Sequence, residues 1–179
     1  MGACRFGDNG GMNVPTPTPP SPTDRLHQVP VHTLARRLGQ AGLVPFVVFA
    51  LLLWVVTEEA LPYVALTLVA YAALIVSFLG GIHWGLVWVR QAGVPDIPPL
   101  ADRAAKLHLL WGVVPSLLAW PGVLMPAYAA LPWLGLLLVV CYLVDRRTYP
   151  DSGLGHWLTL RFQLSSVAAL SCFVGAGAV

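Results

Sequence analysis

A long uncharged apolar stretch of the chain limits the solvents in which it can fold. Residues 63–89 contain no Asp, Glu, Lys or Arg, and the 179-residue chain is 57% hydrophobic and only 10% charged. Soluble domains carry about 25% charged residues, and roughly 20 consecutive apolar residues let one helix cross a bilayer core. A helix also satisfies its own backbone polar groups, as lipid requires. The sequence therefore predicts an all-α integral membrane protein and excludes an ordinary soluble protein.

Five apolar segments, bounded by Pro, Gly or charged residues, predict a five-helix transmembrane bundle. They cover residues 41–57, 63–89, 107–124, 127–144 and 157–178. Residues 1–30 are rich in Pro and predict a disordered tail, in which Met12 is an alternative start to Met1. Residues 31–40 form a basic juxtamembrane segment. Its apolar spacing fits a short helix on the membrane surface and the first turns of the first spanning helix equally well.

The distribution of charge supports this count. With five crossings, all 10 Lys and Arg residues fall on one side of the membrane, whereas the opposite connections carry Glu58 and Glu59 and no cation. By the positive-inside rule, the N-terminus lies inside and the C-terminus outside. Because the cations fit this membrane arrangement and form no basic stripe on a polar surface, no nucleic-acid partner is expected.

Small residues recur at every fourth position of the second segment. Ala73, Ser77, Gly81 and Gly85 therefore predict a helix-packing groove, along which another backbone can approach closely. The fifth segment is also rich in small residues, so we expect it to pack against this groove.

His83 is the best single functional candidate, because it lies within a predicted span and on the face opposite the groove. Three interpretations stay open: a neutral histidine satisfied by another helix, a proton relay or ligand contact, and a metal or haem ligand. His108 and His156 lie on the same side and are weak candidates to share a metal with His83. No close pair such as HxxxH supports a metal, so no cofactor is expected. Trp84 is a candidate for packing or for a ring platform under a ligand.

Asp145 and Arg161 end the fourth segment and begin the fifth on the same side of the membrane. An ion pair between them would lower the cost of an arginine inside the membrane. The alternative is an arginine that reaches the headgroups and an aspartate in water.

Several motifs that mark enzymes do not occur in the sequence. There is no GxxxxGK[ST], GxGxxG, HExxH or GxSxG, and no carboxylate falls within a predicted span. These absences argue against an ATPase, a protease and a proton-coupled pump, and no catalytic residue is expected.

Four stretches carry a resemblance to a known family. They are SFLGGIHWG over residues 77–85, VPSLLAW over 114–120, GLVPF over 42–46 and LRFQLS over 160–165. On these residues the sequence resembles the transmembrane protein 69 family, a domain of unknown function found in bacterial inner membranes and in mitochondria. The resemblance implies a small multi-pass protein of the bacterial inner (plasma) membrane, or of the mitochondrial inner membrane if eukaryotic, with no established reaction.

Three functions remain open from the sequence. The first is a non-enzymatic structural, assembly or interaction component, whose partner is another membrane protein or a second copy. The second is a small channel or carrier with His83 in an inner-leaflet cavity, and the third is a haem or metal protein using His83 with His108 or His156. A cavity that reaches His83 would favour the second function over the first.

Overall fold

The computed structural model describes residues 30–93, 97–150 and 153–179. Its helices are α2 (Val31–Ala41), α3 (Val44–Leu52), α4 (Leu61–Gln91), α5 (Asp102–Leu124), α6 (Ala127–Thr148), the short 3-10 helix η1 (Gly155–Trp157) and α7 (Leu158–Ala176). The described ranges contain no strand. The tail predicted over residues 1–30 lies outside them, apart from Pro30.

Five helical segments are long and apolar enough to cross a membrane. They are Val31–Leu52, Leu61–Gln91, Asp102–Leu124, Ala127–Thr148 and Gly155–Ala176. Large apolar side chains such as Leu66, Leu74 and Leu117 point outward, as side chains that contact lipid do. The prediction of an all-α, five-helix membrane fold is confirmed.

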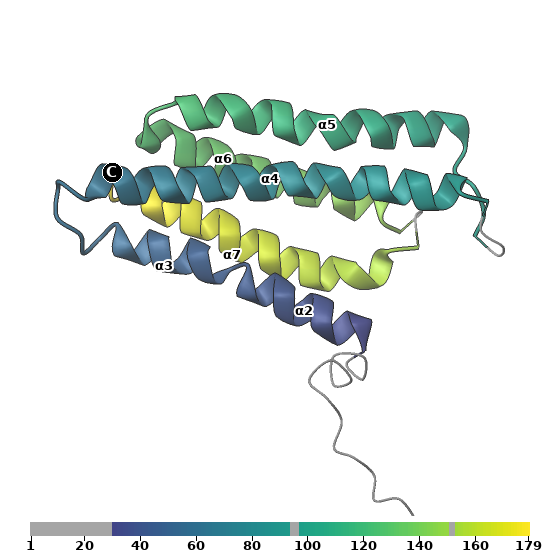
Figure 1. The fold of residues 1–179 in the computed structure, drawn as a ribbon, viewed down its shortest axis with the longest axis horizontal. Helices are drawn as coiled ribbons and strands as arrows, with labels where there is room; N and C mark the ends of the chain where they lie inside the picture. The colour runs from purple at the N-terminus through teal and green to yellow at the C-terminus, as the bar shows by residue number, and fades with distance from the viewer. Residues whose placement is uncertain (1–29, 94–96, 151–152) are drawn as a thin grey trace, which may run out of the picture. The chain divides into compact units, whose positions relative to one another are not determined.

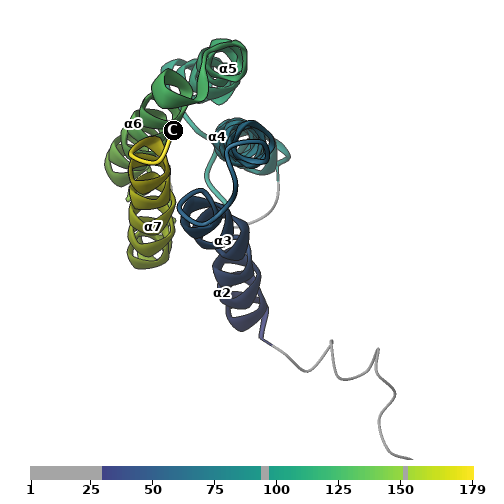
Figure 2. The same ribbon diagram turned by 90° about the vertical axis from the view of Figure 1, so that its left-hand side faces the viewer.

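Residues 35–179 form one compact unit, whose core lies between α3, α4, α6 and α7. Viewed along the helices, α5, α6 and α7 form an arc, and α4 and α3 lie on its inner side (Figure 2). Leu68, Val76, Leu131 and Leu134 fill the centre with almost no exposed surface. α4 contacts α3, α5, α6 and α7, and it is therefore the central helix of the bundle.

α4 and α6 end, and α5 and α7 begin, at the same end of the bundle (Figure 1). We call it the cationic end, because it carries Arg90, Arg103, Lys106, Arg146 and Arg147. His83, His108, Asp145 and Arg161 all lie toward this end.

The first helix differs from the prediction, which placed it over residues 41–57. The structure has two helices, α2 and α3, separated by a turn at residues 42 and 43, and α3 ends at Leu52. Pro45 lies in the first turn of α3 and has no N–H to donate to the carbonyl of Ala41, so a continuous helix loses a hydrogen bond there. The Tyr71 hydroxyl donates to the Gly42 carbonyl at 2.8 Å and satisfies the turn.

The predicted groove of small residues is not covered by α7. A Cβ atom added at Gly81 or Gly85 would meet nothing within 4 Å, and α7 packs chiefly on α6 and α3. The glycine that permits close packing is Gly80, whose Cβ atom would collide with the carbonyl of Gly112 on α5. The expectation that the fifth segment packs against this groove was wrong, because a four-residue spacing marks a stripe of small residues but does not show which helix covers it.

Candidate functional site

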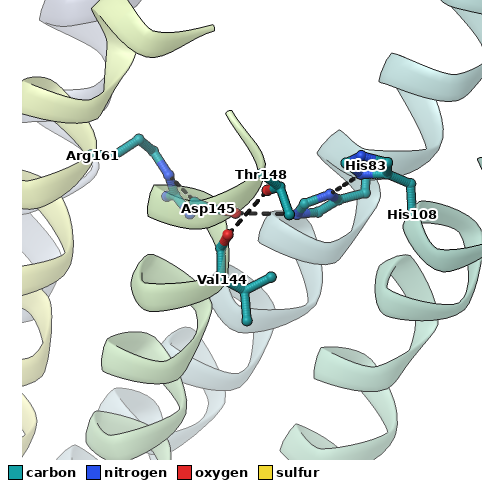
Figure 3. A network of polar contacts seen from close by, with 6 residues as sticks. All are labelled: His83, His108, Val144, Asp145, Thr148 and Arg161. Atoms are coloured by element: carbon teal, nitrogen blue, oxygen red, sulfur yellow. Dashed lines mark hydrogen bonds and ion pairs between the residues drawn. The ribbon is translucent and has the colours of Figure 1, made fainter. Parts of the chain in front are cut away.

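Four polar side chains from four different helices form one buried network at the cationic end (Figure 3). Arg161 of α7 donates from Nε to Asp145 Oδ2 of α6 at 2.8 Å, and its Nη2 also pairs with Oδ2. The other oxygen of Asp145, Oδ1, lies 3.1 Å from His83 Nε2 of α4. His83 Nδ1 lies 2.8 Å from His108 Nδ1 of α5. The network joins α7, α6, α4 and α5 in that order.

Burial makes each of these contacts necessary. His83 and Asp145 are each only 1% exposed, while His108 and Arg161 are 8% and 9% exposed. A charge left unpaired in such surroundings is strongly unfavourable, but Asp145 faces a guanidinium on one oxygen and an imidazole on the other. These contacts therefore lower the free-energy cost of burying an arginine and an aspartate inside the bundle.

The two histidines constrain each other's protons. Because Asp145 accepts on both oxygens, His83 donates from Nε2 and its Nδ1 is the acceptor in the neutral form. His108 then donates from Nδ1, and its Nε2 becomes an acceptor. Nε2 of His108 takes no part in the contact with His83. A proton taken up at this atom can pass through the Nδ1 to Nδ1 contact, and the positive charge then lies on His83 beside Asp145.

Tyr149 lies beside the network, just beyond the end of α6. It is 3% exposed, and its ring centroid lies 6.2 Å from that of His83. Burial, and after it the Asp145 carboxylate, raises the pKa of Tyr149 to about 12. Its hydroxyl therefore stays protonated over the physiological range.

A cavity of about 440 Å³ reaches the histidine end of the network. We call it the histidine cavity. Its polar wall consists of His83, His108, Arg147 and Thr148, and the rest is apolar. Ligand cavities of about 300 to 1,000 Å³ with few polar groups are typical of sites for small molecules. No Asp or Glu lines it, so its charged wall is purely cationic.

Comparison with known proteins identifies the family. A family model described as "Protein of unknown function (DUF3429)" matches residues 31–177. The chain belongs to the DUF3429 family. It is 36% identical to Transmembrane protein 69 of Xenopus tropicalis over 143 residues, which cover 77% of this chain and 51% of that protein. It is 37% identical to Transmembrane protein 69 of Mus musculus over 75 residues, or 41% of this chain and 30% of that protein.

These matches confirm the resemblance to the transmembrane protein 69 family. The DUF3429 chain matches about half or less of the length of these curated relatives. No solved structure matches it.

The structure brings together four of the residues singled out from the sequence. Of the two alternatives left open for Asp145 and Arg161, it contains the ion pair, and it adds His83 to it. His108 completes the network, whereas His156 is exposed in η1, with its ring centroid 5.3 Å from that of Trp157. The expectation that no carboxylate lies within a span was wrong, because α6 continues to Thr148 and encloses Asp145.

Trp84 lies outside the network. It is 40% exposed, and its indole Nε1 donates to the Leu109 carbonyl of α5 at 3.0 Å. Its observed contact is thus a helix-packing one.

A metal site does not form among the described residues. No three His, Cys, Asp or Glu side chains in these ranges are placed to hold an ion together. Sequence reasoning missed Tyr149 and Arg147. Arg147 follows Asp145 by two positions on the same helix, but only the place of α5 shows that it faces a cavity.

Proposed function

We propose that this DUF3429 protein is a non-enzymatic membrane protein, of the carrier or channel class, that binds a small organic anion in the histidine cavity together with a proton. The main support for this proposal is the hydrogen bond between His83 and His108 in the wall of that cavity. A ligand in the cavity can therefore contact a pair of histidines that can accept a proton. The histidine farther from the ligand, His83, donates a hydrogen bond to Asp145.

The charge of the cavity favours an anion with an apolar body. Arg147 supplies a permanent positive charge, and leucine, valine and tryptophan side chains supply apolar surface. Proton uptake by the histidine pair adds a second positive charge. It also converts His108 Nε2 from an acceptor into a donor, so a carboxylate gains both charge attraction and a hydrogen bond.

The test uses fluorobenzoate as the probe and the purified protein in lipid nanodiscs, with binding followed by fluorine NMR. We expect affinity to rise as the pH falls, by up to about tenfold per pH unit if one proton is taken up with the ligand. His108→Gln should remove the pH dependence, and Arg147→Gln should weaken binding at every pH.

Two matched variants control for nonspecific adsorption. His156→Gln changes an exposed histidine, and Arg146→Gln changes an exposed arginine that does not line the cavity. Both should bind like the wild type. Binding that is independent of pH, or equal losses in the Arg146 and Arg147 variants, would refute the proposal.

Assembly with another membrane protein or a second copy is the second candidate function. The observation that favours it is the open face at Gly81 and Gly85, where a Cβ atom would meet nothing within 4 Å. Such a face lets a partner helix approach closely. Analytical ultracentrifugation in mild detergent tests it: Gly81→Leu should dissociate a complex that Leu117→Phe, at an exposed position of α5, leaves intact.

For location we propose that the cationic end faces the cytoplasm of a bacterial cell, or the matrix of a mitochondrion. The positive-inside rule supports this orientation. An impermeant maleimide should label a cysteine introduced at Glu58 from outside and should not label one introduced at Arg103. The opposite pattern would reverse the topology.

A further inference from the structure

The histidine cavity lies between two helices that separate toward the cationic end. Near the turn that joins them, α5 and α6 pack closely: the Trp133 indole donates to the Leu118 carbonyl at 2.8 Å, and a Cβ atom at Gly122 would lie 3.1 Å from the Trp133 ring. Toward the cationic end α6 passes behind α4 and away from α5 (Figure 1). The cavity occupies the space between the two helices there, since α5 and α6 supply most of its wall.

One side of the histidine cavity reaches the surface of the bundle. Leu107 and Leu110 belong to its wall and are 58% and 67% exposed, so they form its outer edge. Leu110 lies eight residues after Asp102, the first residue of α5, which is about 12 Å along a helix. Because α5 is apolar and long enough to cross a membrane, the exposed side of the bundle faces hydrocarbon chains at this depth. A ligand can therefore reach the cavity from the bilayer.

The charged and apolar parts of the cavity wall lie at different depths. Arg147 is in the last turn of α6, at the level of the lipid headgroups, and His108 is in the second turn of α5. From His108 to Val114 the wall extends about 9 Å further toward the bilayer centre, and there Trp111 and Val114 supply aromatic and aliphatic surface. A fatty acid in the same leaflet has its carboxylate and its chain in this order.

We infer that the organic anion of the proposed function is a fatty acid, which enters the histidine cavity from the bilayer between α5 and α6. The inference rests on the proposed function and names its substrate class. The carboxylate lies at Arg147 and His108, and the chain lies along Trp111 and Val114. A phospholipid matches the cavity less well, because its phosphate stays ionised and has no use for a proton from the histidine pair.

Photo-cross-linking of the full chain in phosphatidylcholine nanodiscs tests the inference. The probe is dodecanoic acid with a diazirine group in the middle of its chain, and peptide mass spectrometry locates the labelled residues. About a tenfold excess of unlabelled dodecanoate should lower the labelling of Trp111 and Val114 about tenfold, since both acids compete for one site. Labelling of Leu117, a 64% exposed residue of α5, should not change, because bulk lipid contacts do not saturate. Methyl dodecanoate, which lacks the carboxylate, should not compete.

Two pairs of variants separate the carboxylate end from the chain end. Arg147→Gln should weaken the labelling that dodecanoate competes for, whereas Arg146→Gln, at an arginine outside the cavity wall, should behave like the wild type. Val114→Phe fills the apolar end of the cavity and should lower the labelling of Trp111. Val113→Phe is its matched control, at a 40% exposed position that does not line the cavity.

Labelling of Trp111 and Val114 that excess dodecanoate does not reduce would overturn the inference, as would equal competition by methyl dodecanoate or by phosphatidylglycerol. The fluorobenzoate measurement distinguishes this failure from that of the proposed function. Fluorobenzoate binding that depends on pH, without competition by dodecanoate, overturns the fatty acid alone. Loss of both results overturns the proposed function as well.

Discussion

Gly80 of α4 packs directly against Gly112 of α5, so that a Cβ atom at Gly80 would collide with the carbonyl oxygen of Gly112. The indole of Trp84 fills the space that a Cβ atom at Gly112 would occupy. Within a membrane the hydrophobic effect does not hold helices together, so close packing and hydrogen bonds must do so. The interface between α4 and α5 therefore requires glycine, which has no side chain, at both Gly80 and Gly112.

Gly80→Ala should destabilise the protein. The added methyl group has backbone on its far side and cannot be absorbed by a rotamer change, so a cost of about 1 to 3 kcal/mol is expected. Thermal melting in detergent measures it. Gly81→Ala is the control, because a Cβ atom there meets nothing within 4 Å. If the two variants melt alike, the close approach of α4 and α5 is not the one described.

The adjacent glycines also show what the sequence can predict. Apolar length and charge placement define the membrane helices, because both follow from the properties of the bilayer and need no knowledge of neighbours. Which face of a helix meets which partner depends on tertiary packing. The four-residue spacing singled out Gly81 and Gly85, but α5 approaches from the side of Gly80.

The buried network could be predicted in part for the same reason. A histidine within a span and an acidic and a basic residue at neighbouring helix ends are costly in lipid, so the sequence marks His83, Asp145 and Arg161 as residues in need of partners. The order of the contacts depends on how four helices are placed around one another. The hydroxyl of Ser165 is buried without a hydrogen-bond partner among the described residues. The sequence does not predict this, since serine is common among small residues in packed membrane helices.

Asp145→Asn should be among the most damaging single substitutions. It removes the charge that Arg161 and His83 both face, and breaking a buried pair typically costs about 3 to 5 kcal/mol. We expect a large loss of folded yield and of melting temperature in detergent. Glu58→Gln, at an exposed carboxylate, is the control. The double variant Asp145→Leu with Arg161→Met removes both charges, so it should recover part of the loss; no recovery would mean that the pair is not the source of the cost.

Trp84→Phe should weaken the interface between α4 and α5 by removing one hydrogen bond. The ring still covers Gly112, but the Leu109 carbonyl loses the donor that lies 3.0 Å away. Hydrogen bonds between membrane helices contribute about 0.6 to 1.7 kcal/mol. Trp88→Phe, at a 68% exposed position on the same helix, is the matched control. Equal melting temperatures for the two variants would show that the bond contributes nothing.

Tyr149 should make the stability of the protein depend on pH in the alkaline range. Its pKa rises from 10.0 to about 12 on folding, first because of burial and then because of Asp145. Below pH 10 the hydroxyl is protonated in both the folded and the unfolded chain, so its contribution to the free energy of unfolding is at its full value. Between pH 10 and 12 the unfolded chain ionises first, and the free energy of unfolding falls by roughly 3 kcal/mol in total.

Thermal melting of the wild type between pH 9 and 12 should therefore show a decline that Tyr149→Phe lacks, because phenylalanine has no proton to lose. Tyr63→Phe, at a 75% exposed position, is the control and should decline like the wild type. A difference absorbance titration at the tyrosinate band gives the same pKa directly. If Tyr149→Phe declines as steeply as Tyr63→Phe, Tyr149 is not buried beside Asp145 in the folded protein.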